Sequence, residues 1–277
     1  MKNGVKHEAT DIVIGPMQVR WIEEASYRAV TEGRLRNEDR EPWCREIEQR
    51  ARSGEPLQYL LGYWSFRELE LHVDQRALIP RPETELIVDL VADALGGANA
   101  IGTTHLGVEV GVGTGAISLA LASEIAGVTM WGTEISPEAL ELARENASLV
   151  QFAPGSSAQF VRGNVLAGLP DEIVLRAEFL VSNPPYLSDL LMKSASATVR
   201  DFEPTRALHG GADGLDVIRV ILEEARQRMA VGSFVVIEYS SEQREEIMAL
   251  ARGHRFVDIV SVADLTGRDR FMFARHG

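Results

Sequence analysis

From residue 106 onward the chain alternates between short apolar runs and helical patterns, and this alternation constrains the fold more than any other feature. The apolar runs predict five strands, at Leu106–Val110, Val128–Thr133, Gln159–Arg162, Phe179–Ser182 and Ser233–Tyr239. Helical patterns follow at residues 116–126, 137–150, 214–230 and 242–252. This order predicts an α/β fold with a doubly wound parallel sheet, closed by a pair of strands at Phe256–Val262 and Arg270–Ala274.

The first part of the chain has a different pattern. Residues 16–52 suit helices, because apolar side chains recur at helical spacing behind a first-turn proline, Pro16. Near-alternating apolar residues between Trp64 and Val73 then predict a hairpin. We therefore predict two domains: a helical N-terminal domain with its hairpin linker at residues 1–75, and a ligand-binding domain at residues 76–277.

Composition limits the partners that the chain can have. Its net charge of −13 repels a phosphate backbone, so no direct contact with nucleic acid is expected. A single cysteine, Cys44, can form no intramolecular disulfide and leaves no Cys-rich metal site, so no metal is expected. The stretch Met1–Gly15 lacks a signal-peptide core, and no run is long enough to span a membrane. We therefore expect a cytoplasmic protein without a membrane partner.

A glycine turn follows the first strand of the predicted sheet. Gly111, Val112, Gly113, Thr114 and Gly115 place a glycine at every second position, so the backbone can approach a ligand closely. Ligands of such sheets lie beyond the carboxyl ends of the strands. The G-x-G-x-G spacing differs from the dinucleotide pattern G-x-G-x-x-G and is similar to that of class I methyltransferases. Nicotinamide cofactor binding is the weaker reading.

An acid supports a nucleoside ligand. Glu134 stands at the end of the second strand, 19 residues after Gly115, where a carboxylate can accept hydrogen bonds from both hydroxyls of a ribose. The glycine turn alone would fit a tight strand-to-helix connection, and the acid makes nucleoside binding the better interpretation.

The fourth strand ends in Asn183, Pro184, Pro185 and Tyr186, a combination that indicates methyl transfer to nitrogen. An amide nitrogen is a poor nucleophile because its lone pair is delocalised into the carbonyl group. The side-chain oxygen of Asn183 and the backbone carbonyl of Pro184 can accept from its N–H groups and hold it in line. Proline fixes φ, so this geometry is preset. Tyr186 offers a flat face to the planar group, and no general base is required.

These residues resemble the release-factor glutamine N5-methyltransferases of the HemK/PrmC type. The resemblance runs from Glu55 to Ala274 and includes four further blocks, Glu55–Gly62, Leu78–Glu85, Phe202–Pro204 and Gly210–Leu215. The Ile-Pro-Arg-Pro-Glu-Thr-Glu block at residues 79–85 is the most specific. The glycine turn and the Asn-Pro-Pro-Tyr turn also occur in DNA enzymes that methylate amino groups.

The resemblance implies a class I methyltransferase fold, a Rossmann-like doubly wound sheet with a small helical N-terminal domain and a hairpin linker. It implies S-adenosylmethionine as cofactor, S-adenosylhomocysteine as product, and a peptide-chain release factor as partner, methylated at the glutamine of its Gly-Gly-Gln loop. We also expect a monomer, in which residues 76–277 form the cofactor-binding catalytic domain.

The resemblance also assigns residues. The glycine turn and Glu134 would hold the cofactor, Asn183 would serve both ligands, and Pro184 to Tyr186 would line the glutamine slot. Arg81 to Glu85, with Arg81 and Glu83 as substrate contacts, would close over the site. Asn164 and Val165 stand where the family commonly has an acid facing the adenine, and the Asn164 side-chain oxygen can still accept from the adenine amino group.

Other acceptors fit the same nitrogen grip. These are a ribosomal-protein glutamine, a small molecule with an amide or amine, and the amino group of adenine. A cofactor-binding adaptor without catalysis is a further alternative. The retention of Asn183 through Tyr186 counts against it, because no structural role requires all four residues.

Overall fold

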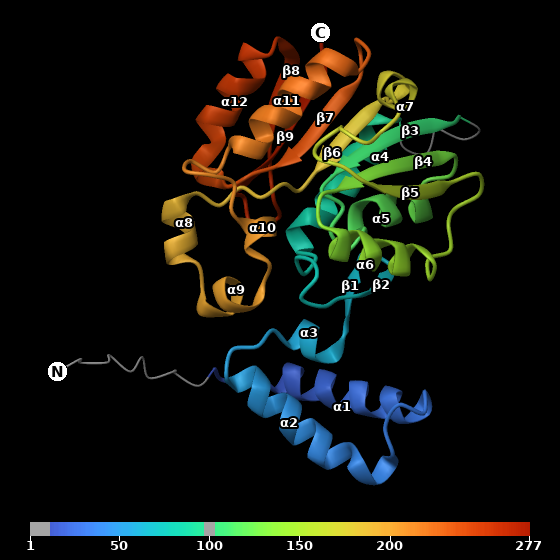
Figure 1. Cartoon of the computed structure of the whole chain (residues 1–277), viewed down its shortest axis with the longest axis vertical. Coiled ribbons are helices and arrows are strands. Elements are labelled where there is room, and N and C mark those ends of the chain that lie inside the picture. The colour runs from blue at the N-terminus through green and yellow to red at the C-terminus, as the bar shows by residue number, and fades with distance from the viewer. Residues whose placement is uncertain (1–11, 97–102) are drawn as a thin grey trace, which may run out of the picture.

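A seven-stranded sheet forms the centre of the molecule (Figure 1) in a computed structural model that describes residues 12–96 and 103–277. Its order is β5-β4-β3-β6-β7-β9-β8. The strands are β3 (His105–Val110), β4 (Val128–Glu134), β5 (Ser157–Arg162), β6 (Phe179–Ser182), β7 (Phe234–Glu238), β8 (Phe256–Ala263) and β9 (Asp269–His276). All of the strands predicted for this sheet are present, with ends shifted by a few residues.

The pairing of the strands fixes where a ligand can bind. Parallel ladders join β5 to β4, β4 to β3, β3 to β6 and β6 to β7, while β9 runs antiparallel to both β7 and β8. The carboxyl ends of β3, β4 and β6 therefore meet at one edge. The strand order reverses between β3 and β6, the position at which open α/β sheets bind ligands.

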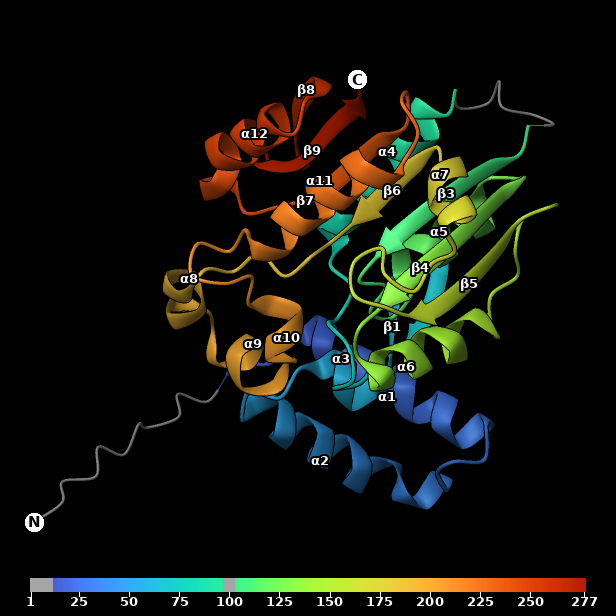
Figure 2. The same cartoon turned by 45° about the horizontal axis from the view of Figure 1, so that its top comes forward.

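Helices cover both faces of the sheet, as the alternation predicts (Figures 1 and 2). In β6, Phe179 and Val181 point into one buried cluster and Leu180 into the other, since successive side chains of a strand face opposite sides. The first cluster contains α4 (Leu86–Ala94), α5 (Ala116–Glu124) and α6 (Pro137–Ala147). The second contains α7 (Asp171–Arg176), α11 (Asp216–Arg228) and α12 (Arg244–Gly253).

The N-terminal part is helical and has a small core of its own. Ile22, Ile47 and Leu57 are buried together there, each from a different helix. Its elements are α1 (Pro16–Thr31), η1 (Asn37–Asp39), α2 (Arg40–Arg52), α3 (Leu57–Leu61), β1 (Tyr63–Phe66) and β2 (Leu69–His72). The hairpin of β1 and β2 confirms the predicted pair, whereas the short α3 was not predicted. Residues 1–11 of the predicted first domain, and most of Met1–Gly15, lie outside the described residues.

The hairpin is attached firmly to the sheet domain. Phe66 and Leu71 are buried in the same cluster as α4 and α5. Asn146 on α6 is fully buried, accepts from the backbone N–H of His72 at 2.8 Å and donates to its carbonyl at 3.0 Å. The hairpin thus links the N-terminal helices to the sheet through fixed contacts.

Three short helices follow β6 and lie beside the carboxyl edge of the sheet (Figures 1 and 2). They are α8 (Asp189–Ser194), α9 (Ala197–Phe202) and α10 (Thr205–Leu208). Phe202 approaches Gly54, so this segment also borders the N-terminal helices. The short helix η2 (Pro82–Glu85) precedes α4, and η4 (Ser241–Gln243) precedes α12. Within residues 12–96 and 103–277, no helix is long and apolar enough to cross a membrane.

Candidate active site

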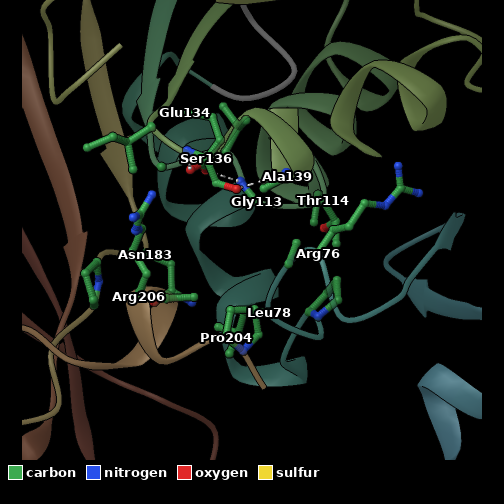
Figure 3. Close-up of a pocket in the computed structure, with 18 of the residues that line it drawn as sticks. Arg76, Leu78, Gly113, Thr114, Glu134, Ser136, Ala139, Asn183, Pro204 and Arg206 are labelled. Carbon is green, nitrogen blue, oxygen red and sulfur yellow. Dashed lines mark hydrogen bonds between the residues drawn. The ribbon is translucent and has the colours of Figure 1, made fainter. Parts of the chain in front are cut away.

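A cavity of about 1460 Å³ opens at the carboxyl edge of the sheet, where the predicted site residues converge (Figure 3). Its walls come from the ends of β3, β4 and β6, from the segment between the hairpin and η2, and from α10. The predicted residues that line it are Arg81, Gly111, Val112, Gly113, Thr114, Glu134, Asn164, Val165, Asn183 and Pro185. Glu83, Gly115, Pro184 and Tyr186 are not part of its lining.

The glycine turn forms the floor beside β3. Gly111 and Gly113 have φ angles of +74° and +53°, in the left-handed region that favours glycine. A Cβ atom at Gly111 would meet nothing within 4 Å, so the missing side chain leaves open space there. Gly115 instead starts α5 and packs against Leu119. Its contribution is to the turn rather than to the cavity wall.

Glu134 is held by the backbone on both sides of its carboxylate. Its Oε2 accepts from the N–H of Gly113 at 3.0 Å, and its Oε1 accepts from the N–H of Ser136 at 2.9 Å. The side chain is largely buried at the end of β4 and lines the cavity. Each carboxylate oxygen can accept more than one hydrogen bond, so both remain able to bind hydroxyl groups of a ligand.

The loop after β5 supplies a third part of the wall. Asn164 is exposed and lines the cavity together with Val165. Val165 has a φ of +52°, a strained conformation for a β-branched residue and one often found at functional sites. The hydroxyl of Thr133 donates to the Val165 carbonyl at 2.5 Å and helps to maintain this conformation.

A second carboxylate, Glu109, lies beside the glycine turn and was not among the predicted site residues. It lines the cavity, is almost fully buried, and accepts from the backbone N–H of Ser118 at 2.9 Å and from the Ser118 hydroxyl. Burial raises the pKa of Glu109 to about 8. Its position at the end of β3 was a signal that could have identified it.

The turn after β6 places two of its four residues in the cavity wall and the other two away from it. Asn183 and Pro185 line the cavity, and Pro184 is buried behind them. The ring of Tyr186 packs against the cluster around α11 and α12, and its hydroxyl donates to Glu238 Oε1 at 3.1 Å. Burial, with the neighbouring Glu238 carboxylate, raises the pKa of Tyr186 above its usual value.

Backbone contacts support this turn from the loop at residues 210–215. A Cβ atom at Gly214 would lie 2.2 Å from the carbonyl oxygen of Tyr186, and one at Gly210 would lie 2.4 Å from that of Pro185. Gln243 donates to the carbonyls of Tyr186 at 2.9 Å and Asp213 at 2.8 Å. Only glycine allows this close approach, which explains the Gly-Gly-Ala-Asp-Gly block.

Only some residues of the segment before α4 line the cavity. Arg81 lines the cavity and donates to Glu203 Oε1 at 2.5 Å, which joins this segment to the loop before α10. The other carboxylate oxygen of Glu203 is buried and has no hydrogen-bond partner among the residues that the structure describes. Glu83 is exposed. Thr84, which belongs to the Arg81–Glu85 segment predicted to close over the site, is buried and lines the cavity.

Charge in the cavity suits a cationic ligand near the glycine turn. The Glu134 carboxylate lines that region and opposes a pyrophosphate. Among the lining residues, Arg50, Arg76 and Arg81 are paired with carboxylates. Arg206 on α10 reaches the cavity on the same side as Asn183 (Figure 3). Within the described residues, no cluster of His, Cys, Asp and Glu could hold a metal ion.

These features fit S-adenosylmethionine. Open space at Gly111 admits a ligand against the backbone, Glu134 offers two fixed oxygens, and its carboxylate suits a ligand that carries positive charge. The fold and the site thus define a class I S-adenosylmethionine-dependent methyltransferase. Residues 89–202 match the family model "Methyltransferase small domain".

Comparison with known proteins gives the family. A release factor glutamine methyltransferase of Deinococcus radiodurans is 39% identical over 229 residues, covering 83% of this chain and 77% of the relative. The corresponding protein of Vibrio cholerae is 37% identical, covering 82% of this chain and 76% of the relative. The chain therefore belongs to the release factor glutamine methyltransferase family, which confirms the resemblance seen in the sequence.

Solved structures show the fold alone. The hMettl16 catalytic domain has a TM-score of 0.59 at 16% identity, covering 79% of this chain and 80% of that one. A methyltransferase from Pyrococcus furiosus has a TM-score of 0.53 at 16% identity, covering 77% and 91%.

Proposed function

We propose that this enzyme methylates the side-chain amide nitrogen of a protein glutamine, that of the Gly-Gly-Gln motif in peptide-chain release factors. The observation that supports the proposal is the orientation of the Asn183 side-chain amide. Its Nδ2 donates to Thr84 Oγ1 at 3.1 Å, so its carbonyl oxygen Oδ1 is left to accept a hydrogen bond at the cavity wall. The family relationship supports the release factor as the acceptor protein.

The residues of this chain position the acceptor. Asn183 Oδ1 and the Pro184 carbonyl accept from the two N–H groups of the glutamine amide and direct its nitrogen toward the glycine turn. When bound, S-adenosylmethionine supplies a methyl carbon made electrophilic by a sulfonium centre. Glu134 would bind the ribose hydroxyls of the cofactor, and Glu109 lines the same part of the cavity beside the glycine turn. The nitrogen would gain the methyl group as the bond between that carbon and the sulfonium sulfur breaks, S-adenosylhomocysteine would leave as the neutral thioether, and the surplus proton of the nitrogen would pass to water.

Residues 1–75 are proposed to dock the acceptor protein. Arg50 and Glu55 line the cavity from this part of the chain, so a loop that enters the site passes the N-terminal helices. We also propose that the enzyme acts as a monomer.

An isotope-transfer assay tests the proposal. The purified protein, labelled S-adenosylmethionine and a release factor should give label on the Gly-Gly-Gln glutamine, and a release factor with that glutamine changed to alanine should stay unlabelled. Tight cofactor binding without any transfer to the release factor would contradict the assignment. Efficient labelling of a free amide or of an adenine oligonucleotide, with none on the release factor, would favour another acceptor.

A further inference from the structure

Asn183 belongs to a buried hydrogen-bond network that ends on one carboxylate. Asn183 Nδ2 donates to Thr84 Oγ1 at 3.1 Å, and the Thr84 hydroxyl donates to Glu238 Oε2 at 2.7 Å. The other oxygen of that carboxylate, Oε1, accepts from the Tyr186 hydroxyl at 3.1 Å. Glu238 is 1% exposed and Thr84 is 4% exposed, so water does not replace these partners.

The polarity of this network determines the orientation of the Asn183 amide. The Thr84 hydroxyl has one hydrogen, and the carboxylate of Glu238 can only accept, so that hydrogen points to Glu238. The lone pairs of Thr84 Oγ1 can then only receive a hydrogen, which selects the NH₂ group of Asn183 and not its oxygen. An amide flipped by 180° would place an oxygen against an oxygen that has no hydrogen to give. The unflipped amide keeps Oδ1 on the other side.

We propose that Thr84 and Glu238 are positioning residues, which fix the Asn183 side chain with its oxygen toward the acceptor nitrogen. This inference rests on the proposed function, because a flipped Asn183 would present N–H groups to the N–H groups of the acceptor amide. Neither residue has to touch the acceptor nitrogen. Glu238 also holds Tyr186 through its second oxygen, so one carboxylate sets two residues of the same turn.

Glu238 must be ionised for this hydrogen-bond network to fix the Asn183 amide. Burial raises its pKa, the hydrogen bonds from Thr84 and Tyr186 oppose that rise, and Arg270 on β9 also opposes it. The nearby Glu83 adds to the rise. A protonated Glu238 carries its own hydrogen, so Thr84 is no longer forced to donate to it. Activity should therefore fall on the acid side at a pH above that at which an exposed glutamate titrates.

Thr84→Val tests the inference, since it keeps the shape of the side chain and removes the hydroxyl. We expect kcat to fall by about 100-fold, the scale on which a lost preorganised group acts, with the cofactor Kd within about threefold of wild type. Thr84→Ser keeps the hydroxyl and should restore kcat to within about threefold. In Glu238→Gln, an NH₂ group replaces one of the two oxygens that accept from the hydroxyls of Thr84 and Tyr186. This variant should have a lower kcat, and its pH profile should lack the acid limb.

Ser182→Ala is the matched control. Ser182 is also a buried hydroxyl, next to Asn183 in the chain, but it donates to the Val110 carbonyl at 2.7 Å and not to this network. This variant should lose thermal stability comparable to Thr84→Val and retain kcat. A Thr84→Val enzyme within threefold of wild-type kcat, or a Thr84→Ser enzyme as slow as Thr84→Val, would overturn the proposal.

A readout without catalysis separates this inference from the proposed function. The side-chain NH₂ signal of Asn183 in a ¹⁵N NMR spectrum, assigned by its loss in Asn183→Ala, should show slow hydrogen exchange in the wild type. It should exchange faster in Thr84→Val and remain slow in Ser182→Ala. If the release factor is not methylated but this exchange pattern holds, the proposed acceptor is wrong and the positioning of Asn183 is still supported. Equal exchange in all three proteins would refute the positioning.

Discussion

Replacing Glu134 by glutamine removes one charge and reverses one hydrogen-bonding group at the centre of the proposed cofactor site. In the wild type, both carboxylate oxygens accept from backbone N–H groups, of Gly113 and Ser136. A glutamine side chain has only one oxygen, so its NH₂ group must face one of these two donors. That contact is repulsive, and it turns the side chain away from the position in which it can face a ribose.

The magnitude follows from the two ribose hydroxyls that Glu134 is proposed to bind. A hydrogen bond to a charged group contributes about 1.5–3 kcal/mol and one between neutral groups about 0.5–1.5 kcal/mol. The substitution therefore costs about 1–1.5 kcal/mol per hydroxyl and about 2–3 kcal/mol in total. Because 1.4 kcal/mol is a factor of ten, we expect the Kd of S-adenosylmethionine to rise by about 30- to 150-fold.

Isothermal titration of the cofactor into each variant measures this change. Glu141→Gln is the control, because Glu141 is exposed on the neighbouring helix α6 and lies outside the lining of the cavity. It removes the same charge, which solvent screens, and should change the Kd by less than about threefold. A folded Glu134→Gln protein that binds the cofactor within threefold of wild type would refute this role of Glu134.

Three other perturbations have defined outcomes. Asn183→Ala should lower single-turnover methyl transfer by at least about 100-fold and leave the cofactor Kd within about tenfold, roughly 1.4 kcal/mol; wild-type turnover would contradict the nitrogen grip. Asn146→Ala removes the hydrogen-bond partner of the N–H and carbonyl of His72 and of the buried carbonyl of Thr114, and should lower the free energy of unfolding in urea by about 2–4 kcal/mol; a loss below 0.5 kcal/mol would contradict this role of Asn146 in attaching the hairpin. Burial raises the pKa of Glu109 to about 8, so between its unfolded pKa of about 4.3 and pH 8 the folded state binds more protons and stability falls as pH rises. Glu109→Gln should reduce this slope in urea titrations at several pH values, and an unchanged slope would contradict it.

Local patterns in the sequence were sufficient for the fold. The apolar runs of β3, β6 and β7 are recognisable because a strand covered on both faces is apolar at most positions. The glycine turn and Glu134 were identifiable from spacing, since the ends of parallel strands must meet at one edge. The short helices α3, α7, α8, α9 and α10 were not predicted, because so few residues show no clear helical period.

Spatial neighbours of the site were harder to find. Glu109 and Glu238 end strands at the same edge as Asn183, so their positions were available in the sequence. Nothing in the sequence indicated that Thr84 contacts both Asn183 and Glu238, 99 and 154 residues away. Tyr186 was predicted to offer its face to the acceptor, and that role remains a prediction. In the structure its ring packs against the helix cluster.

The sequence by itself determined the alternation of strands and helices, the glycine backbone at the proposed cofactor site and the chemical groups of the proposed nitrogen grip. These depend on periodicity, backbone freedom and residue type, which are local properties. The tertiary structure alone decided which end of the Asn183 side-chain amide binds Thr84 and which end is left for the cavity. It also decided how deeply Glu109 is buried and which carboxylates form ion pairs. Hydrogen-bond polarity and desolvation depend on atoms brought together from distant segments, and only the packed chain contains that information.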